Sequence, residues 1–131
     1  MKETTKNWMD FTLRDIKAAN ELRDNEFYSN IVCFHSQQAV EKAIKAILEE
    51  FSILIPRTHN VLKLYSLLPE KIKSELCIDK NELSDIDEIY SETKYPSELG
   101  LLTYGFPSKH TAIKFYNISK NIVDKIKNII Q

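Results

Sequence analysis

Apolar side chains recur every three or four residues along most of the chain, and this spacing predicts helices. A first helix is expected over about 7–22, with a wide apolar face on which Asp15 shares a stripe with Trp8, Phe11, Ala18 and Leu22. The longest helix is expected over about 27–51, where neither glycine nor proline interrupts the pattern. At 1.5 Å per residue such a helix spans roughly 37 Å. We therefore expect it to form the spine of the domain.

Proline and glycine divide the rest of the chain. Pro56 interrupts the helical pattern, and a short helix is expected over about 60–68, with Thr58 or Asn60 as its cap. Pro69 ends it, and one or two weak turns follow over 70–77. Another helix is expected to begin at Asp79 or Asn81 and to end near 94. Residues 95–109 hold two prolines and both glycines, so they predict a loop.

The last helix is expected over about 108–130, with Ser108 as its candidate N-cap, and its apolar positions leave only a narrow polar strip. Such a surface needs more than one neighbour, and a second copy of the chain is a candidate for part of it. The pattern as a whole predicts an all-α fold, an up-and-down bundle of four main helices plus a short fifth helix. Residues 1–131 form a single domain in this prediction, with no internal repeat.

Composition narrows the class of function. Two glycines and four prolines are too few for a β-sandwich or a barrel. The chain carries 18 basic and 19 acidic residues, a net charge of −1, so no overall field favours nucleic acid or an anionic membrane. No strong nucleic-acid binding is expected, and a phosphate would need a local site. No long apolar stretch or signal peptide is apparent, which favours the cytoplasm and no membrane contact.

Polar residues of the longest helix form the first candidate site. Four of them follow one stripe, and two more lie beside it: His35, Gln38, Lys42 and Lys45, with Gln37 and Glu41. Glu41 and Lys45 are four residues apart, in the favourable order for an ion pair. The stripe either lines a groove for an anion such as a nucleotide phosphate, or is simply solvated and internally paired. For His35 alone, the favoured interpretation is a partly buried histidine that bonds a neighbouring helix.

Two further clusters extend this candidate site. Arg57 and His59 precede the short helix, whose first N–H groups and dipole favour an anion. The alternative is a cluster that caps the helix and fixes the loop. Lys94 and Tyr95 end the next helix, and Tyr90 shares a face with Lys94, which presents a cation and aromatic rings to a nucleotide. Otherwise Lys94 complements the helix dipole and Tyr95 packs on the loop. No metal-ligand or catalytic motif is present.

Together these segments resemble a known family. The stretch NIVCFHSQQAVEKAIKAIL (30–48), then RTHN (57–60), then Tyr90 with KYP (94–96), then a long terminal helix, is similar to the HEPN domain, named for higher eukaryotes and prokaryotes nucleotide-binding. The resemblance covers nearly the whole chain. It implies a bundle of four or five helices, usually homodimeric. It also implies a minimal nucleotidyltransferase as partner, sometimes as a toxin–antitoxin pair.

Some members of that family are metal-independent ribonucleases, in which an Arg is followed after four to six residues by a His. This sequence departs from that pattern, because Arg14 and Arg23 precede His35 by 20 and 11 intervening residues, and Arg57 precedes His59 by one. We therefore assign no catalytic residue and expect a non-catalytic protein that binds a partner or a nucleotide such as ATP, with no required cofactor. The alternatives are a ribonuclease with a divergent site, built for example from His35, Arg57 and His59, and a purely structural helical adaptor.

Overall fold

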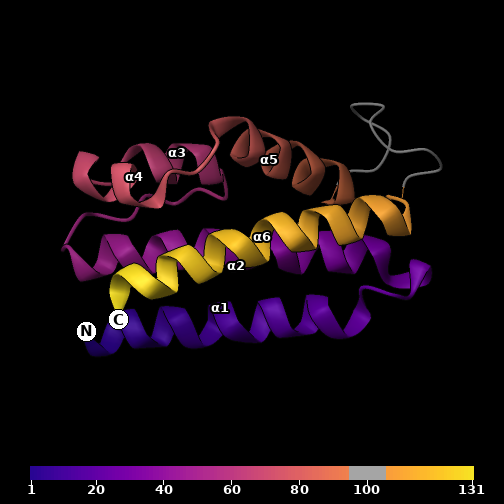
Figure 1. Ribbon diagram of the computed structural model, residues 1–131, viewed down its shortest axis with the longest axis horizontal. Coiled ribbons are helices and arrows are strands. Elements are labelled where there is room, and N and C mark those ends of the chain that lie inside the picture. The colour runs from indigo at the N-terminus through magenta and orange to yellow at the C-terminus, as the bar shows by residue number, and fades with distance from the viewer. Residues whose placement is uncertain (95–105) are drawn as a thin grey trace.

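The computed structural model describes the backbone of residues 1–94 and 106–131, and the side chains of these residues except 92–94. This part of the chain is helical and holds no strand, which confirms the all-α prediction. Four long helices run up and down, and two short helices lie between the second and the third of them along the chain, next to the third (Figure 1). The elements are α1 (Glu3–Leu22), the 3-10 turn η1 (Glu26–Tyr28), α2 (Ser29–Glu50), α3 (Val61–Ser66), α4 (Glu70–Leu76), α5 (Lys80–Lys94) and α6 (Lys109–Ile130).

Helix α2 is the spine of the bundle, as the sequence predicts. It packs against α1 along most of its length, and it also contacts α3, α5 and α6 (Figure 1). Alanines make this close packing possible, because they carry little side chain at the helix contacts. Ala39, Ala43 and Ala46 of α2, together with Ala19 of α1 and Ala112 of α6, are fully buried. Larger side chains of α2, such as Ile44, complete the core.

The wide apolar face of α6 is explained by the number of helices that it contacts. It packs on α2, α1 and α4, which confirms the expectation of more than one neighbour. Its start is capped by Ser108, whose hydroxyl accepts a hydrogen bond from the backbone N–H of Thr111 at 3.1 Å. Some apolar side chains at the edges of its buried face are only half-buried: Ile113, Phe115, Ile118, Ile129 and Ile130. None of the helices in 1–94 and 106–131 is long and apolar enough to cross a bilayer.

The structure differs from the prediction at the two ends of the first helical hairpin. Helix α1 begins at Glu3 instead of near residue 7, because the chain start is tied to the end of α2. The carboxylate of Glu50 accepts hydrogen bonds from the backbone N–H of Lys2 and the hydroxyl of Thr5, both at 2.9 Å. At the other end, the expected helix 27–51 begins as the 3-10 turn η1, where Asn25 accepts from the N–H of Phe27 at 3.0 Å.

The region between Pro56 and α5 holds two short helices, where the prediction counted one plus weak turns. Helix α3 is capped by Asn60, as expected, through a 2.7 Å hydrogen bond from the N–H of Lys63. Helix α4 ends at Leu76, and its C-cap residue Cys77 adopts the left-handed conformation with φ 51° and closes the last turn. The loop predicted over 95–109 lies largely outside the described residues.

Core packing around α2 generates the first prediction. We expect Ile44→Ala to lower the free energy of unfolding by about 2–5 kcal/mol, because it leaves a cavity where the side chain is fully buried. Urea denaturation followed by circular dichroism measures the change. The control Leu54→Ala removes similar atoms from a side chain that is 89% exposed, and it should cost less than about 0.5 kcal/mol. Equal losses in the two variants would contradict the assigned core.

Candidate functional site

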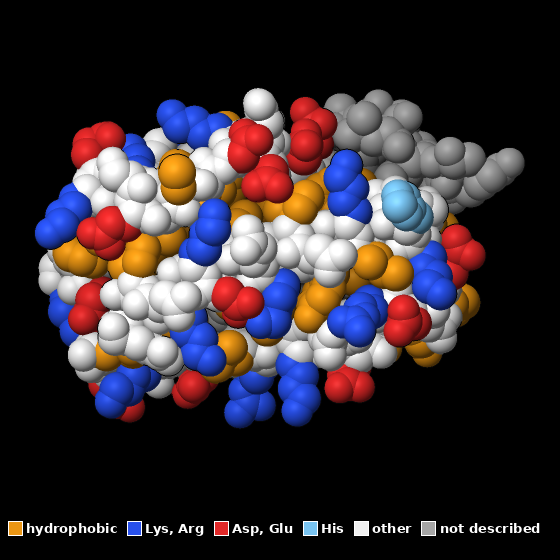
Figure 2. All heavy atoms as spheres, in the orientation of Figure 1, with side chains coloured by type: hydrophobic (Ala, Val, Ile, Leu, Met, Phe, Trp, Pro, Cys, Tyr) orange, Lys and Arg blue, Asp and Glu red, His pale blue; other side chains and the backbone are white. Residues whose placement is uncertain are grey.

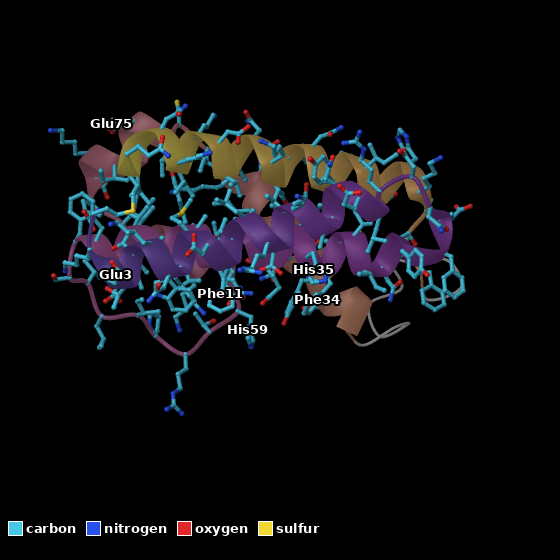
Figure 3. All side chains as sticks on the ribbon, turned by 90° about the horizontal axis from the view of Figure 1, so that it is seen from below. Glu3, Phe11, Phe34, His35, His59 and Glu75 are labelled. Atoms are coloured by element: carbon cyan, nitrogen blue, oxygen red, sulfur yellow. The ribbon has the colours of Figure 1, made fainter. Side chains whose placement is uncertain are left out.

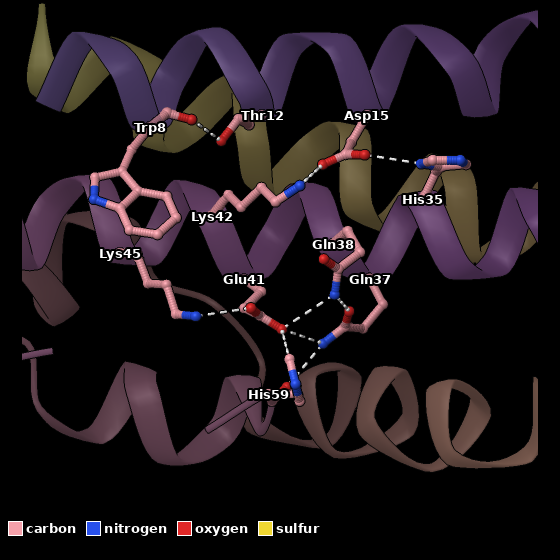
Figure 4. A network of polar contacts seen from close by, with 10 residues as sticks. All are labelled: Trp8, Thr12, Asp15, His35, Gln37, Gln38, Glu41, Lys42, Lys45 and His59. Atoms are coloured by element: carbon pink, nitrogen blue, oxygen red, sulfur yellow. Dashed lines mark hydrogen bonds and ion pairs between the residues drawn. The ribbon is translucent and has the colours of Figure 1, made fainter. Parts of the chain in front are cut away.

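The polar stripe of α2 lies on the side of the bundle away from α6, with α1 along one edge and the loop before α3 along the other. Figure 3 shows Phe11, Phe34, His35 and His59 on this side. Polar contacts join residues of α1, α2 and that loop into two clusters, each around one carboxylate (Figure 4). All six α2 candidates thus take part in these clusters, which also include residues that the sequence did not single out.

The first cluster surrounds Asp15 of α1, which is 8% exposed. Its two carboxylate oxygens contact His35 Nδ1 at 2.8 Å and Lys42 Nζ at 2.6 Å (Figure 4). Burial acts to raise the pKa of Asp15, but the hydrogen bonds and charges of His35 and Lys42 outweigh it, so this pKa lies below its ordinary value. The cluster therefore holds an ionised carboxylate and pins α1 to α2.

The helical spacing predicts Asp15 on the apolar face of the first helix, and Asp15 is not among the predicted site residues. Its position was correct, because the residue is buried at the contact between α1 and α2. An acidic residue on an otherwise apolar face needs a charged partner. This rule indicates from the sequence that Asp15 has a charged partner. It does not identify Lys42 and His35 as the partners, because both lie on another helix.

The second cluster surrounds Glu41 of α2, which is 3% exposed. One carboxylate oxygen accepts from Lys45 Nζ at 2.8 Å, the pair that the spacing predicts. The other lies 3.1 Å from His59 Nδ1 and 3.2 Å from the amide nitrogens of Gln37 and Gln38. An ionised carboxylate only accepts hydrogen bonds. This buried charge is thus surrounded by donors from α2 and from the loop before α3 (Figure 4).

Gln37 extends the Glu41 cluster to the loop backbone. Its amide nitrogen donates to the carbonyl of His59 at 2.8 Å, and its amide oxygen accepts from Gln38 at 2.7 Å. Gln37 is fully buried, so these bonds satisfy a side chain that has no access to water. Both the ring and the backbone of His59 are therefore held against α2, while its side chain remains 60% exposed.

The N-terminus of α3 does not offer the free N–H groups that the sequence analysis expected for an anion. Val61 and Leu62 donate their N–H groups to the two carboxylate oxygens of Asp87, at 2.8 and 3.1 Å, and Lys63 donates to Asn60. Burial and the nearby charge of Glu41 raise the pKa of Asp87, and the two N–H bonds act against that rise. The protein's own carboxylate occupies the place expected for a phosphate, which corrects that part of the hypothesis.

The remaining candidates are Arg57, Tyr90, Lys94 and Tyr95. Arg57 is exposed and makes no hydrogen bond or ion pair within the described residues, so its guanidinium is open to a ligand. The Tyr90 ring is buried, with its centroid 5.8 Å from the rings of both Phe34 and His59. The backbone of Lys94 ends α5, but its side chain and all of Tyr95 lie outside the described residues.

Aromatic rings of α1 lie beside the two lysines. Lys42 Nζ is 5.6 Å from the centroid of the Phe11 ring, and Lys45 Nζ is 5.6 Å from that of Trp8. Such contacts stabilise an ammonium group while leaving some of its donors free. Within the described residues, no three His, Cys, Asp or Glu side chains are placed to hold a metal ion. The site can therefore bind an anion that carries an aromatic group, or it can exchange protons at the two imidazoles.

Comparisons with known proteins agree with this fold. A family model described as HEPN domain matches residues 5–129. The crystal structure of TT1696 from Thermus thermophilus is similar, with a TM-score of 0.81 at 19% identity over 97% of this chain and 98% of that one. The structure of ST0689, described as an archaeal HEPN homologue, has a TM-score of 0.74 at 25% identity over the full length of both chains. No curated protein matches the sequence.

The Asp15 cluster generates the second prediction. We expect Asp15→Asn to lower the free energy of unfolding by about 1–3 kcal/mol, because it leaves Lys42 and His35 without their carboxylate. The lowered pKa of Asp15 means that its contribution is present above the pKa of the unfolded chain, roughly 3.9, and disappears as the pH falls through the folded value. The gap between wild type and variant should thus close in acid.

The control for this experiment is Asp124→Asn. Asp124 pairs with Lys120 at 2.6 Å on the surface of α6, where both side chains are about half exposed. Such a pair contributes about 0–0.5 kcal/mol, so the control should unfold like the wild type. Denaturation of all three proteins between pH 2 and pH 7 makes the comparison. A difference between wild type and Asp15→Asn that stays constant over this range would refute the assigned role of the charge.

Proposed function

The chain belongs to the HEPN domain family, and from this premise we propose that it is a non-catalytic binding module. In this proposal a homodimer works in the cytoplasm with a minimal nucleotidyltransferase and receives a nucleotide such as ATP on the polar stripe of α2. A toxin–antitoxin type of pair is one form that such a partnership takes in the family. No cofactor is needed for this role.

One observation carries the proposal: lysines and histidines from two segments converge on one side of the bundle, beside aromatic rings. Lys42 and His35 meet at Asp15, and Lys45 and His59 meet at Glu41. When both imidazoles are neutral, the positive charges of the two lysines equal the negative charges of the two carboxylates. Each imidazole that takes a proton then adds one positive charge. An anion that settles here gains from cations that are already held in place.

The open edge of the Glu41 cluster is the favoured entrance for the phosphates. Lys45 is only 12% exposed, whereas His59 is 60% exposed and Arg57 projects freely from the same loop. Arginine grips phosphate through two parallel N–H groups. A phosphate that contacts Arg57 and His59 would thus lie at the surface, with Lys45 behind it as a fixed charge.

A divergent ribonuclease is the second candidate function. The observation in its favour is that His35 and His59 each present Nδ1 to a carboxylate, which orients an imidazole for acid–base chemistry. Against it stands the spacing of arginine and histidine, which does not match the pattern of the family's ribonucleases. In addition, each carboxylate is also paired with a lysine, Asp15 with Lys42 and Glu41 with Lys45, so the geometry favours a binding role over a catalytic one.

Helix α6 supplies the surface that we propose for the homodimer. Between its charged residues, hydrophobic side chains show on the face that carries it (Figure 2). The half-buried Ile113, Phe115 and Ile118 lie on this helix. A second copy would exclude water from these side chains, which is the main favourable term in protein association.

Nucleotide binding at the α2 stripe is the third prediction. Isothermal titration with ATP should show a dissociation constant between high micromolar and millimolar, which corresponds to roughly 4–6 kcal/mol. Arg57→Ala and Lys45→Ala should each weaken it about fivefold, since each removes one of the cations near the phosphates, a loss on the order of 1 kcal/mol. The control Lys120→Ala removes a lysine that pairs only with Asp124 among the described residues, so it should bind like the wild type. Absence of binding at several millimolar ATP would leave the structural adaptor as the better description.

Dimer formation is the fourth prediction. Sedimentation velocity at micromolar concentration should show a species of twice the chain's mass. Ile113→Lys should shift it towards the monomer, because it places a charge in the proposed apolar contact. The control Asn81→Lys puts the same charge at an exposed position of another helix, α5, and should leave the dimer intact. A wild-type monomer would overturn the proposed dimer, and an Ile113→Lys dimer would move the interface to another face.

A further inference from the structure

Helix α1 carries a hollow that neither the fold nor the polar clusters use. It has a volume of about 240 Å³ and is lined by Thr4, Asn7, Trp8 and Phe11. This is smaller than the roughly 300–1,000 Å³ of pockets that enclose whole small molecules. The hollow is therefore suited to one flat part of a ligand whose remainder lies outside it.

Two aromatic rings form its wall, although one of them lies largely in water. Phe11 is 57% exposed, which is unusual for so large an apolar side chain. Trp8 is half-buried and packs against the core, so its ring is fixed in position. A fixed ring next to an exposed one is a platform on which a planar heterocycle can stack.

The polar groups at the hollow are free to recognise such a heterocycle. Thr4 and Asn7 are exposed, and their side chains make no hydrogen bond within the described residues. The Asn7 amide offers both donors and an acceptor, which suit the edge of a nucleobase. Donors in the hollow thus remain unused by the protein itself.

The same rings connect the hollow to the cationic stripe of α2. Lys42 Nζ lies over Phe11 and Lys45 Nζ over Trp8, each 5.6 Å from the ring centroid. An ammonium group has three N–H donors, and the bonds to Asp15 and Glu41 use one from each lysine. A ligand whose ring lies on Phe11 would therefore place a negatively charged substituent near two ammonium groups.

We propose that this hollow binds the base of the nucleotide, so that Trp8 and Phe11 recognise the ring while the stripe of α2 recognises the phosphates. The inference rests on the proposed nucleotide binding, and it adds a site for the base to the site for the phosphates. It makes the ligand class a phosphorylated aromatic heterocycle, and it excludes plain polyphosphate as an equivalent ligand.

The test compares ATP with inorganic tripolyphosphate, which lacks the base. Trp8 is the only tryptophan of the chain, so its fluorescence reports directly on the hollow. We expect ATP to change this fluorescence and to bind at least fivefold more tightly than tripolyphosphate, the usual scale of one stacked base. Phe11→Leu should remove this advantage and leave the affinity for tripolyphosphate unchanged. Lys45→Ala should weaken both ligands.

The matched control is Phe27→Leu, which changes an 81% exposed phenylalanine of η1 in the same way. It should bind both ligands like the wild type. Equal affinity for ATP and tripolyphosphate, unaffected by Phe11→Leu, would overturn the base site while the proposed function stands. If neither ligand binds, the proposed function fails and the base site with it. If Phe11→Leu instead turns a dimer into a monomer in sedimentation, the hollow belongs to an interface between copies, which also overturns the base site.

Discussion

The buried carboxylate of Glu41 is the constraint on which the arrangement of the site depends. A charge that is almost fully removed from water must be surrounded by donors, or the folded state loses several kcal/mol. Lys45, Gln37 and Gln38 supply donors from the same helix, but the remaining contact comes from His59, on the loop after α2. The requirement that Glu41 be hydrogen-bonded thus holds that loop against α2, and the loop leads directly into α3.

Three acidic residues connect the helices in the same manner. Asp15 joins α1 to α2, Glu41 joins α2 to the loop before α3, and Asp87 joins α5 to the start of α3. Apolar packing would hold the same helices together but would tolerate small shifts between them. Because each carboxylate needs particular donors at hydrogen-bond distance, these contacts select one placement of the helices around α2. They also bring Glu41 close enough to Asp87 to raise the pKa of Asp87.

Local sequence signals account for what could be predicted. The helical spacing of apolar residues, the caps at Asn60 and Ser108 and the Glu41–Lys45 pair each depend on residues within one or two turns, and all of them appear in the structure. The extension of α1 to Glu3 and the occupation of the α3 N-terminus by Asp87 depend on residues 45 to 48 and 25 to 26 positions away. Periodicity carries no information on such pairs. The polar stripe of α2 was therefore predictable, but the partners of its side chains were not.

The distribution of partners also determines how a ligand can use this surface. Lys42, Lys45 and both histidines already serve the fold, so a phosphate must share them with Asp15 and Glu41 and gains only part of their charge. Sharing limits affinity, and it couples any bound anion to the contacts that hold α1 and the loop before α3. Arg57 and Phe11 are different, because the one has no ion pair among the described residues and the other exposes most of its ring. Selectivity for a ligand therefore has to come mainly from these two side chains, while the shared clusters set where the anion lies.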